Sequence, residues 1–182
     1  FFLEILFPLK LSFCVEIDNL YQVEVDLRLL ESSSEESAYR FALNESLIRV
    51  TGNIDINNND SLDVIFNNPI RYVLQQQKIS DSILSVTLDG VAIEKILDEI
   101  GISIWDSDRP LTIIWIAIDR GLGDREIVGA EEIEITLVDG TKSPGRNFQL
   151  QELFLQEGYR LGIPIMFPLL DIEDLQNIDF ID

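Results

Sequence analysis

The chain contains no histidine and a single cysteine, Cys14, among its 182 residues. Without histidine it can form neither a Ser-His-Asp or Cys-His catalytic group nor an imidazole metal site, and it lacks the usual proton shuttle near neutral pH. One thiol makes no internal disulfide and no thiolate zinc cluster. No Ser-x-x-Lys pattern occurs, so the common Ser-Lys nucleophile is also missing. These absences favour a non-enzymatic protein and predict no cofactor.

Basic residues are scarce, with 13 Lys and Arg against 33 Asp and Glu and a formal net charge of −20. Such a surface repels phosphate backbones and anionic lipid, which argues against nucleic acid as a partner. Cationic partners and divalent ions are tolerated better, although solubility alone is the simpler explanation. Apolar residues make up 46% of the chain, enough for a core in one sizeable domain or two small units.

Long hydrophobic runs are also missing, and the longest candidate is the N-terminal stretch FFLEILFPLKLSFC, residues 1–14. It is too short to span a bilayer, so we expect no transmembrane span. Ser12 and Cys14 place small residues where signal peptidase prefers them, which predicts the remnant of a signal peptide cleaved after Cys14 and a periplasmic protein. Two alternatives stay open: a lipid anchor through Cys14, and a buried or amphipathic first strand.

The polar and apolar pattern divides the rest of the chain into an N-terminal unit, residues 15–106, and an incomplete C-terminal unit, residues 109–182. The first unit is predicted to have the order β-α-α-β-α-β, in which the short helix at 61–68 and the helix that follows it at 69–77 count as one. Its expected elements are a strand at 20–28, a helix from the Ser33 capping-box pattern to Thr51 before Gly52, a short helix at 61–68, a helix at 69–77, a strand at 83–88, a helix between Asp89 and Gly101, and an extended segment at 102–105.

The second unit is predicted to open with a central strand, because PLTIIWIAID, residues 110–119, is apolar on both faces. A hairpin or edge strand at 131–140, a helix at 148–162 and an extended apolar segment at 163–171 follow. This order predicts the start of an open α/β layer, so that the whole chain is α+β to α/β with a Rossmann-like second unit. The abrupt end at 182 predicts that this unit is cut short.

Acidic residues follow two of these predicted strands and form the one candidate site. Asp119 ends the first strand and Asp171 the last, and Asp124 and Glu126 follow Asp119 in a glycine-containing loop. If the two strands were parallel neighbours, their carboxylates would meet at the edge where open α/β folds bind ligands. Oxygen ligands there suit Mg²⁺ or Ca²⁺, which indicates a carboxylate-based, divalent-dependent hydrolase. The alternative, favoured here, is that Asp119 only ends a strand in water.

Two tryptophans flank the junction of the units. Trp105 either packs across the seam or marks a binding surface, and packing is the favoured interpretation. Trp115 lies ten residues further on, inside the predicted central strand.

Several phrases resemble domain-of-unknown-function family 2066 (DUF2066), a family of exported proteins from Gram-negative bacteria. They are VEIDNLYQVEV, SAYRFALNESLIRVTGN, RYVLQQ, DRPLTIIWIAID and LGIPIMFPLLDIEDL. The second unit is more distantly similar to α/β domains of the TolB-N and CsgG type, an analogy of fold alone. The resemblance carries over no catalytic residue. It implies an exported protein. Together with the missing catalytic motifs and the acidic surface, this favours a non-enzymatic envelope accessory protein that works by contact with an envelope protein or a cell-wall component.

Overall fold

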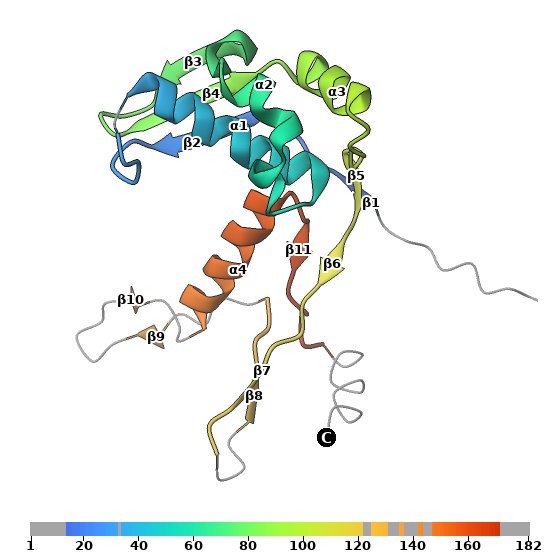
Figure 1. Ribbon diagram of the computed structural model, residues 1–182. Coiled ribbons are helices and arrows are strands. Elements are labelled where there is room, and N and C mark those ends of the chain that lie inside the picture. The colour runs from blue at the N-terminus through green and yellow to red at the C-terminus, as the bar shows by residue number, and fades with distance from the viewer. Residues whose placement is uncertain are drawn as a thin grey trace, which may run out of the picture.

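The computed structural model describes residues 14–32, 34–121, 125–130, 135–136, 142–143 and 147–171. In that part of the chain the protein is mixed α+β, with four helices and several small open sheets (Figure 1). The helices are α1 (Glu35–Thr51), α2 (Asp63–Phe66), α3 (Gly90–Glu99) and α4 (Phe148–Leu161). The strands are β1 (Cys14–Glu16), β2 (Gln22–Asp26), β3 (Val73–Lys78), β4 (Ile83–Leu88), β5 (Asp108–Pro110), β6 (Thr112–Ile113), β7 (Ala117–Asp119), β8 (Arg125–Ile127), β9 (Ile135–Thr136), β10 (Lys142–Ser143) and β11 (Ile165–Met166).

Helix α1 is the central element of the first unit, and local signals fix both of its ends. The hydroxyl of Ser34 accepts a hydrogen bond from the backbone N–H of Ser37 at 3.2 Å, which makes Ser34 the N-cap. This cap comes one residue after Ser33, which lies outside the described residues. At the other end Gly52 adopts φ 67° and donates to the carbonyl of Ile48, so the predicted end of the helix is confirmed.

A three-stranded antiparallel sheet in the order β2-β4-β3 packs against α1. The strands expected at 20–28 and 83–88 are therefore confirmed. Alternation along β2 turns Val23 and Val25 into the core and leaves Glu24 exposed. The core between sheet and helices consists of apolar side chains: Val23, Val25, Ala38, Tyr39, Ala42, Leu43, Leu47, Ile48, Val50, Ile56, Leu62, Ile65, Tyr72, Leu84, Val86, Leu88, Ile93 and Leu97.

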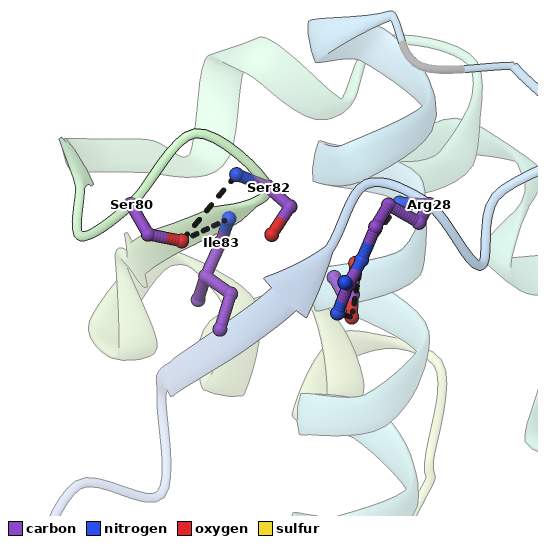
Figure 2. A network of polar contacts seen from close by, with 5 residues as sticks. Arg28, Ser80, Ser82 and Ile83 are labelled. Atoms are coloured by element: carbon purple, nitrogen blue, oxygen red, sulfur yellow. Dashed lines mark hydrogen bonds and ion pairs between the residues drawn. The ribbon is translucent and has the colours of Figure 1, made fainter.

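The prediction of a helix at 69–77 is wrong. Pro69 begins a 3₁₀ turn that ends at Tyr72, and β3 follows directly. A tight turn then reverses the chain into β4: the hydroxyl of Ser80 accepts from the N–H groups of Ser82 and Ile83 (Figure 2). Pairing with β4 outweighs the helix propensity of Leu and Gln in this stretch. The order of the unit is consequently β-α-α-β-β-α from β2 to α3.

A short antiparallel ribbon joins the beginning of the described chain to the start of the second unit. Strand β1 pairs with β5 through Cys14↔Pro110, Val15↔Arg109 and Glu16↔Asp108. Arg109 is thereby held between the two units, with its backbone in β5. Cys14 is exposed and not in a disulfide. Residues 1–13, where the predicted signal segment lies, are outside the described part.

The second unit contains no continuous central strand over 110–119, so that expectation is wrong. The segment divides into β6, which pairs in parallel with β11, and β7, which forms an antiparallel hairpin with β8. The parallel ladder joins only Thr112 to Ile165 and Ile113 to Met166. The described residues form no clear Rossmann unit, which corrects the Rossmann-like expectation. Helix α4 is confirmed where the sequence places it, and it ends at Gly162 with φ 67°.

The rest of the second unit adds a β9–β10 pairing, in the region where the sequence predicts a hairpin or edge strand. Among the described helices, none combines the length and the apolar character that a membrane crossing requires.

Candidate functional site

The predicted carboxylate site begins with Asp119, which ends β7 and is exposed. Its Oδ1 accepts a hydrogen bond from the N–H of Gly121 at 2.7 Å, and Gly121 has φ 83°. This is an Asx-type turn, in which an aspartate replaces a backbone carbonyl to hold a tight loop. The contact gives Asp119 a local structural task and supports the simpler of the two interpretations.

Asp171 does not share a sheet with Asp119. Asp171 follows β11, which pairs with β6, whereas Asp119 ends β7, which pairs with β8. Asp124 lies outside the described residues. Within the described ranges no three Asp, Glu, Cys or His side chains form a group that could hold a metal ion. The C-terminal sheet edge on which the hydrolase hypothesis depends is therefore not built by β7 and β11.

Glu126 takes part in a different contact. It pairs with Arg120 across the β7–β8 hairpin and accepts a hydrogen bond from the side chain of Asn147, the residue before α4. Glu126 thus ties the hairpin to the start of α4. This is a positioning contact for the helix.

The most constrained polar residue is Arg109, which the sequence did not single out. Its side chain is fully buried at 0% exposure, and its hydrogen bonds to described residues all go to backbone carbonyls. Nη1 donates to Gly162 at 2.6 Å, Nη2 donates to Arg49 at 2.8 Å, and Nε donates to Asp106 at 3.0 Å. Weaker bonds reach the carbonyls of Leu161 and Trp105. One guanidinium therefore connects α1, the 105–109 linker and the end of α4.

Trp105 completes this junction. The guanidinium carbon of Arg109 lies 4.1 Å from the centroid of the Trp105 ring, a cation–π contact. The backbone N–H of Trp105 donates to the carbonyl of Val50 at 2.7 Å, next to the end of α1. Trp105 thus packs at the seam, as the favoured interpretation predicts.

A second buried arginine, Arg49, lies beside the first. Its Nη1 donates to the carbonyls of Asn19 and Gln22, both at 3.1 Å, and its Nε donates to Arg160 at 3.5 Å. The guanidinium lies 5.0 Å from the ring of Tyr159. Arg49 therefore holds the turn before β2 against α4.

Burial lowers the pKa of both arginines, and for Arg109 the neighbouring charge of Arg49 lowers it further. Arginine remains protonated in proteins despite such shifts. The cost of burying two cations is offset by hydrogen bonds to carbonyl oxygens, which carry partial negative charge at the C-terminus of α4. Their geometry supports a structural role, in which the two arginines hold the first unit and α4 together. We call Arg49 and Arg109 the arginine lock.

An ion pair reinforces the lock at its edge. Arg160 on α4 lies 3.3 Å from Glu45 on α1 and 2.9 Å from Glu157 on its own helix. Glu45 is largely buried, so this contact adds to the fixed packing of α4 on α1. No local sequence pattern marks the contact between Glu45 and Arg160, because the two residues are 115 positions apart in the chain.

An apolar cleft opens on the side of α4 that faces β11. Its volume is about 440 Å³. The lining is mostly apolar: Ala130, Phe148, Gln151, Glu152, Leu155, Ile165, Met166 and Phe167. Inside it the side chain of Gln151 donates to the carbonyl of Gly129, which fixes one wall.

The apolar surface continues from the cleft onto β6. Met166 lines the cleft and is the register partner of Ile113, and paired residues of neighbouring strands share a face. Trp115 follows two residues after Ile113 along the chain. Ile113 is 54% exposed and Trp115 is 37% exposed. We call the surface formed by the cleft, Ile113 and Trp115 the α4–β6 face.

Comparison with known proteins overturns the resemblance to DUF2066. The family model that matches is a different one, described as a domain of unknown function, DUF8605, and it covers residues 14–106. No curated protein and no solved structure matches the chain. The matched range begins at β1 and ends at Trp105–Asp106, next to the arginine lock. The match spans more than half of the sequence, and the chain therefore belongs to the DUF8605 family of domains of unknown function.

Proposed function

We propose that this protein is a non-enzymatic accessory protein that binds another protein through the α4–β6 face. The observation that carries the proposal is the apolar cleft between α4 and β11, together with the exposed apolar side chains of Ile113 and Trp115 on the segment that pairs with β11 and follows it. Contiguous exposed apolar surface on a soluble domain marks interaction sites more often than isolated apolar residues do. Tryptophan is also enriched among the residues that dominate binding energy at interfaces.

The composition of the face supports a protein partner. The cleft has an apolar floor that includes Phe148, Leu155 and Met166, while Glu152 supplies a charged group at its edge. Protein interfaces combine an apolar centre with a polar rim in this way. The arginine lock supports the same proposal. It holds α4 against the domain that the family model matches, residues 14–106, which we call the family domain, and so presents the α4–β6 face in a fixed geometry.

The proposed place of action is the cell envelope, most simply the periplasm. This part of the proposal rests on the apolar N-terminal segment, residues 1–14, and on its small residues Ser12 and Cys14. Lipid attachment at Cys14 is the alternative mode of retention.

The test is site-specific photo-crosslinking in cells that produce the protein naturally. A photoreactive amino acid replaces Trp115 in one variant and Val64 in a matched control, because Val64 is a similarly exposed apolar residue on α2 of the family domain. We expect a discrete protein adduct at position 115 that excess wild-type protein competes away, and no such adduct at position 64. Equal adducts at both positions, or none at 115, would contradict the proposal.

A further inference from the structure

The free edge of β3 is a second feature that requires an explanation, and it is independent of the α4–β6 face. Strand β3 is an edge strand, because β4 is its only neighbour in the sheet order β2-β4-β3. None of its residues makes a backbone hydrogen bond to another described segment on the outer side. Five of its six residues, Leu74 to Lys78, are exposed. An open edge of this kind is a template for pairing with another extended chain.

The opposite edge of the same sheet is not open in the same way. At β2 the carbonyl of Gln22 already accepts from Nη1 of Arg49 at 3.1 Å, and its N–H donates to Asn19. Strand β2 also carries the acidic residues Glu24 and Asp26. The two edges therefore differ in both hydrogen bonding and charge.

The charge around β3 is unusual for this chain. Residues 64–80 contain no acidic residue, so all 33 Asp and Glu of the sequence lie elsewhere, while Arg71 and Lys78 lie within it. Arg71 is exposed and makes no ion pair in the described part of the chain. Lys78 is paired only at the surface, with Asp81 at 3.2 Å. The edge is therefore flanked by two cations on an otherwise strongly acidic protein.

Large apolar side chains accompany these cations. Ile70, Leu74 and Ile79 are each more than half exposed, and they are spread along the length of the edge. The β-bulge between Val73 and Gln75 leaves Leu74 out of the regular ladder. The Ser80 turn in Figure 2 fixes the far end of the strand. Backbone donors, apolar contacts and positive charge thus lie together along one strand.

We propose that the β3 edge binds an extended segment of a partner protein in which acidic and apolar residues alternate. The segment adds a strand to the sheet: main-chain hydrogen bonds supply affinity, and alternate side chains supply specificity. Acidic side chains meet Arg71 and Lys78, while apolar ones contact Leu74 and its neighbours. A second copy of this chain fits less well, because antiparallel β3–β3 pairing would bring the Arg71 end of one copy to the Lys78 end of the other. A lipid surface fits less well still, because it leaves the free backbone groups without partners.

The test uses a fluorescent, end-blocked eight-residue peptide in which Glu alternates with Val or Ile, and binding is followed by fluorescence anisotropy. We expect saturable binding at low ionic strength, and hydrogen–deuterium exchange that slows in residues 74–79. Two control peptides separate the contributions. One replaces Glu by Lys, and the other carries N-methyl groups on alternate residues, which removes strand pairing while keeping the side chains. Both are expected to bind at least tenfold more weakly.

A matched pair of variants tests the residues. The double variant R71E/K78E reverses the charge beside the edge, while R28E/K95E makes the same change at two other exposed positions. We expect the first to lose at least tenfold in affinity and the second to stay within twofold, with unchanged circular dichroism in both. Equal binding of the N-methylated peptide, or equal loss in both variants, would overturn the proposal. So would concentration-dependent dimerisation through β3, or binding to phosphatidylglycerol vesicles with no binding to the peptide.

Discussion

Arg109 and Gly162 fit each other at atomic contact: Nη1 of Arg109 donates to the carbonyl of Gly162 at 2.6 Å, and a Cβ on Gly162 would overlap that same nitrogen. The glycine also has φ 67°, a left-handed conformation. The end of α4 is therefore shaped around a buried cation, and the position of the second unit depends on this contact.

Substitution of Gly162 tests this fit. Gly162→Ala is expected to destabilise the protein by more than the roughly 1–2 kcal/mol that a left-handed alanine costs, because the new methyl group also displaces Arg109. Gly101→Ala is the matched control, since Gly101 has φ 73° but nothing within 4 Å of the new Cβ. Urea unfolding of both variants measures the difference. Equal losses would mean that Arg109 moves aside without cost.

Replacement of Arg109 is expected to cost more. Arg109→Lys keeps the charge, but its single ammonium nitrogen cannot occupy the separate positions of Nε, Nη1 and Nη2, so the carbonyls of Gly162 and Arg49 cannot both keep their partners. We expect a loss of about 3 kcal/mol or more in the free energy of unfolding. Arg28→Lys, at an exposed pair with Asp26, serves as the control and should leave stability close to that of the wild type. A similar loss of stability in the Arg109 and Arg28 variants would contradict the structural role assigned to Arg109.

Substitution of Trp105 is expected to lower stability, whereas substitution of Trp115 is expected to weaken partner binding. Trp105→Ala removes the ring that stacks on Arg109 and should lower stability by about 2 kcal/mol. Trp115→Ala should leave stability within about 0.5 kcal/mol, while an excess of this variant should fail to compete away the adduct that wild-type protein competes away. Thermal unfolding and competition in the crosslinking assay measure the two effects. A clear drop in the melting temperature of the Trp115 variant would show that Trp115 contributes to stability, and would contradict its assignment to a binding surface.

Tyr21 gives the protein a predictable alkaline response. Burial raises the pKa of its hydroxyl, and the hydrogen bond to Glu94 at 2.7 Å raises it further. Because the folded-state pKa is raised, the associated stability is complete below the unfolded pKa of about 10 and is lost as the pH rises above it. Tyr21→Phe should flatten the fall in stability above about pH 10. An unchanged alkaline slope in this variant would assign the effect to other groups.

Asp119 is expected to behave as a turn residue. Asp119→Asn retains an oxygen that accepts from Gly121, so it should preserve stability, whereas Asp119→Ala should lose about 1 kcal/mol. Millimolar Mg²⁺ or Ca²⁺ should leave the melting temperature of the wild type unchanged. A rise that disappears in Asp119→Asn would instead establish the divalent-ion site and support the hydrolase hypothesis.

Local signals explain which parts of the fold the sequence could predict. Asp89 caps α3 by accepting from the N–H of Ala92, and Gly52 ends α1, so both helices follow from residues adjacent in the chain. Local signals do not predict strand β3, because its conformation depends on pairing with β4 after the Ser80 turn. The apolar run at 110–119 predicts a covered strand, yet Ile113 and Trp115 are exposed.

The contacts of the arginine lock could not be predicted from the sequence, for a related reason. Arg49 and Arg109 are separated by 60 residues and meet only in the folded chain, where each donates to backbone carbonyls. A sequence pattern can indicate a carboxylate partner, but it carries no information about which carbonyls a guanidinium will reach. The sequence instead indicates a site formed by carboxylates, but Asp119 and Asp171 follow strands of different sheets.

The central claim is that Arg109 fastens the second unit to the family domain, and amide exchange in Arg109→Met tests it most directly. Methionine retains bulk beside Trp105 but removes every donor. We expect exchange at the N–H groups of Thr112 and Ile114, which bond to the 164–166 segment, to accelerate at least tenfold, while Ile93 and Ile100 in the α3 region stay protected. Unchanged exchange at Thr112 and Ile114, or equal acceleration at all four amides, would contradict the account.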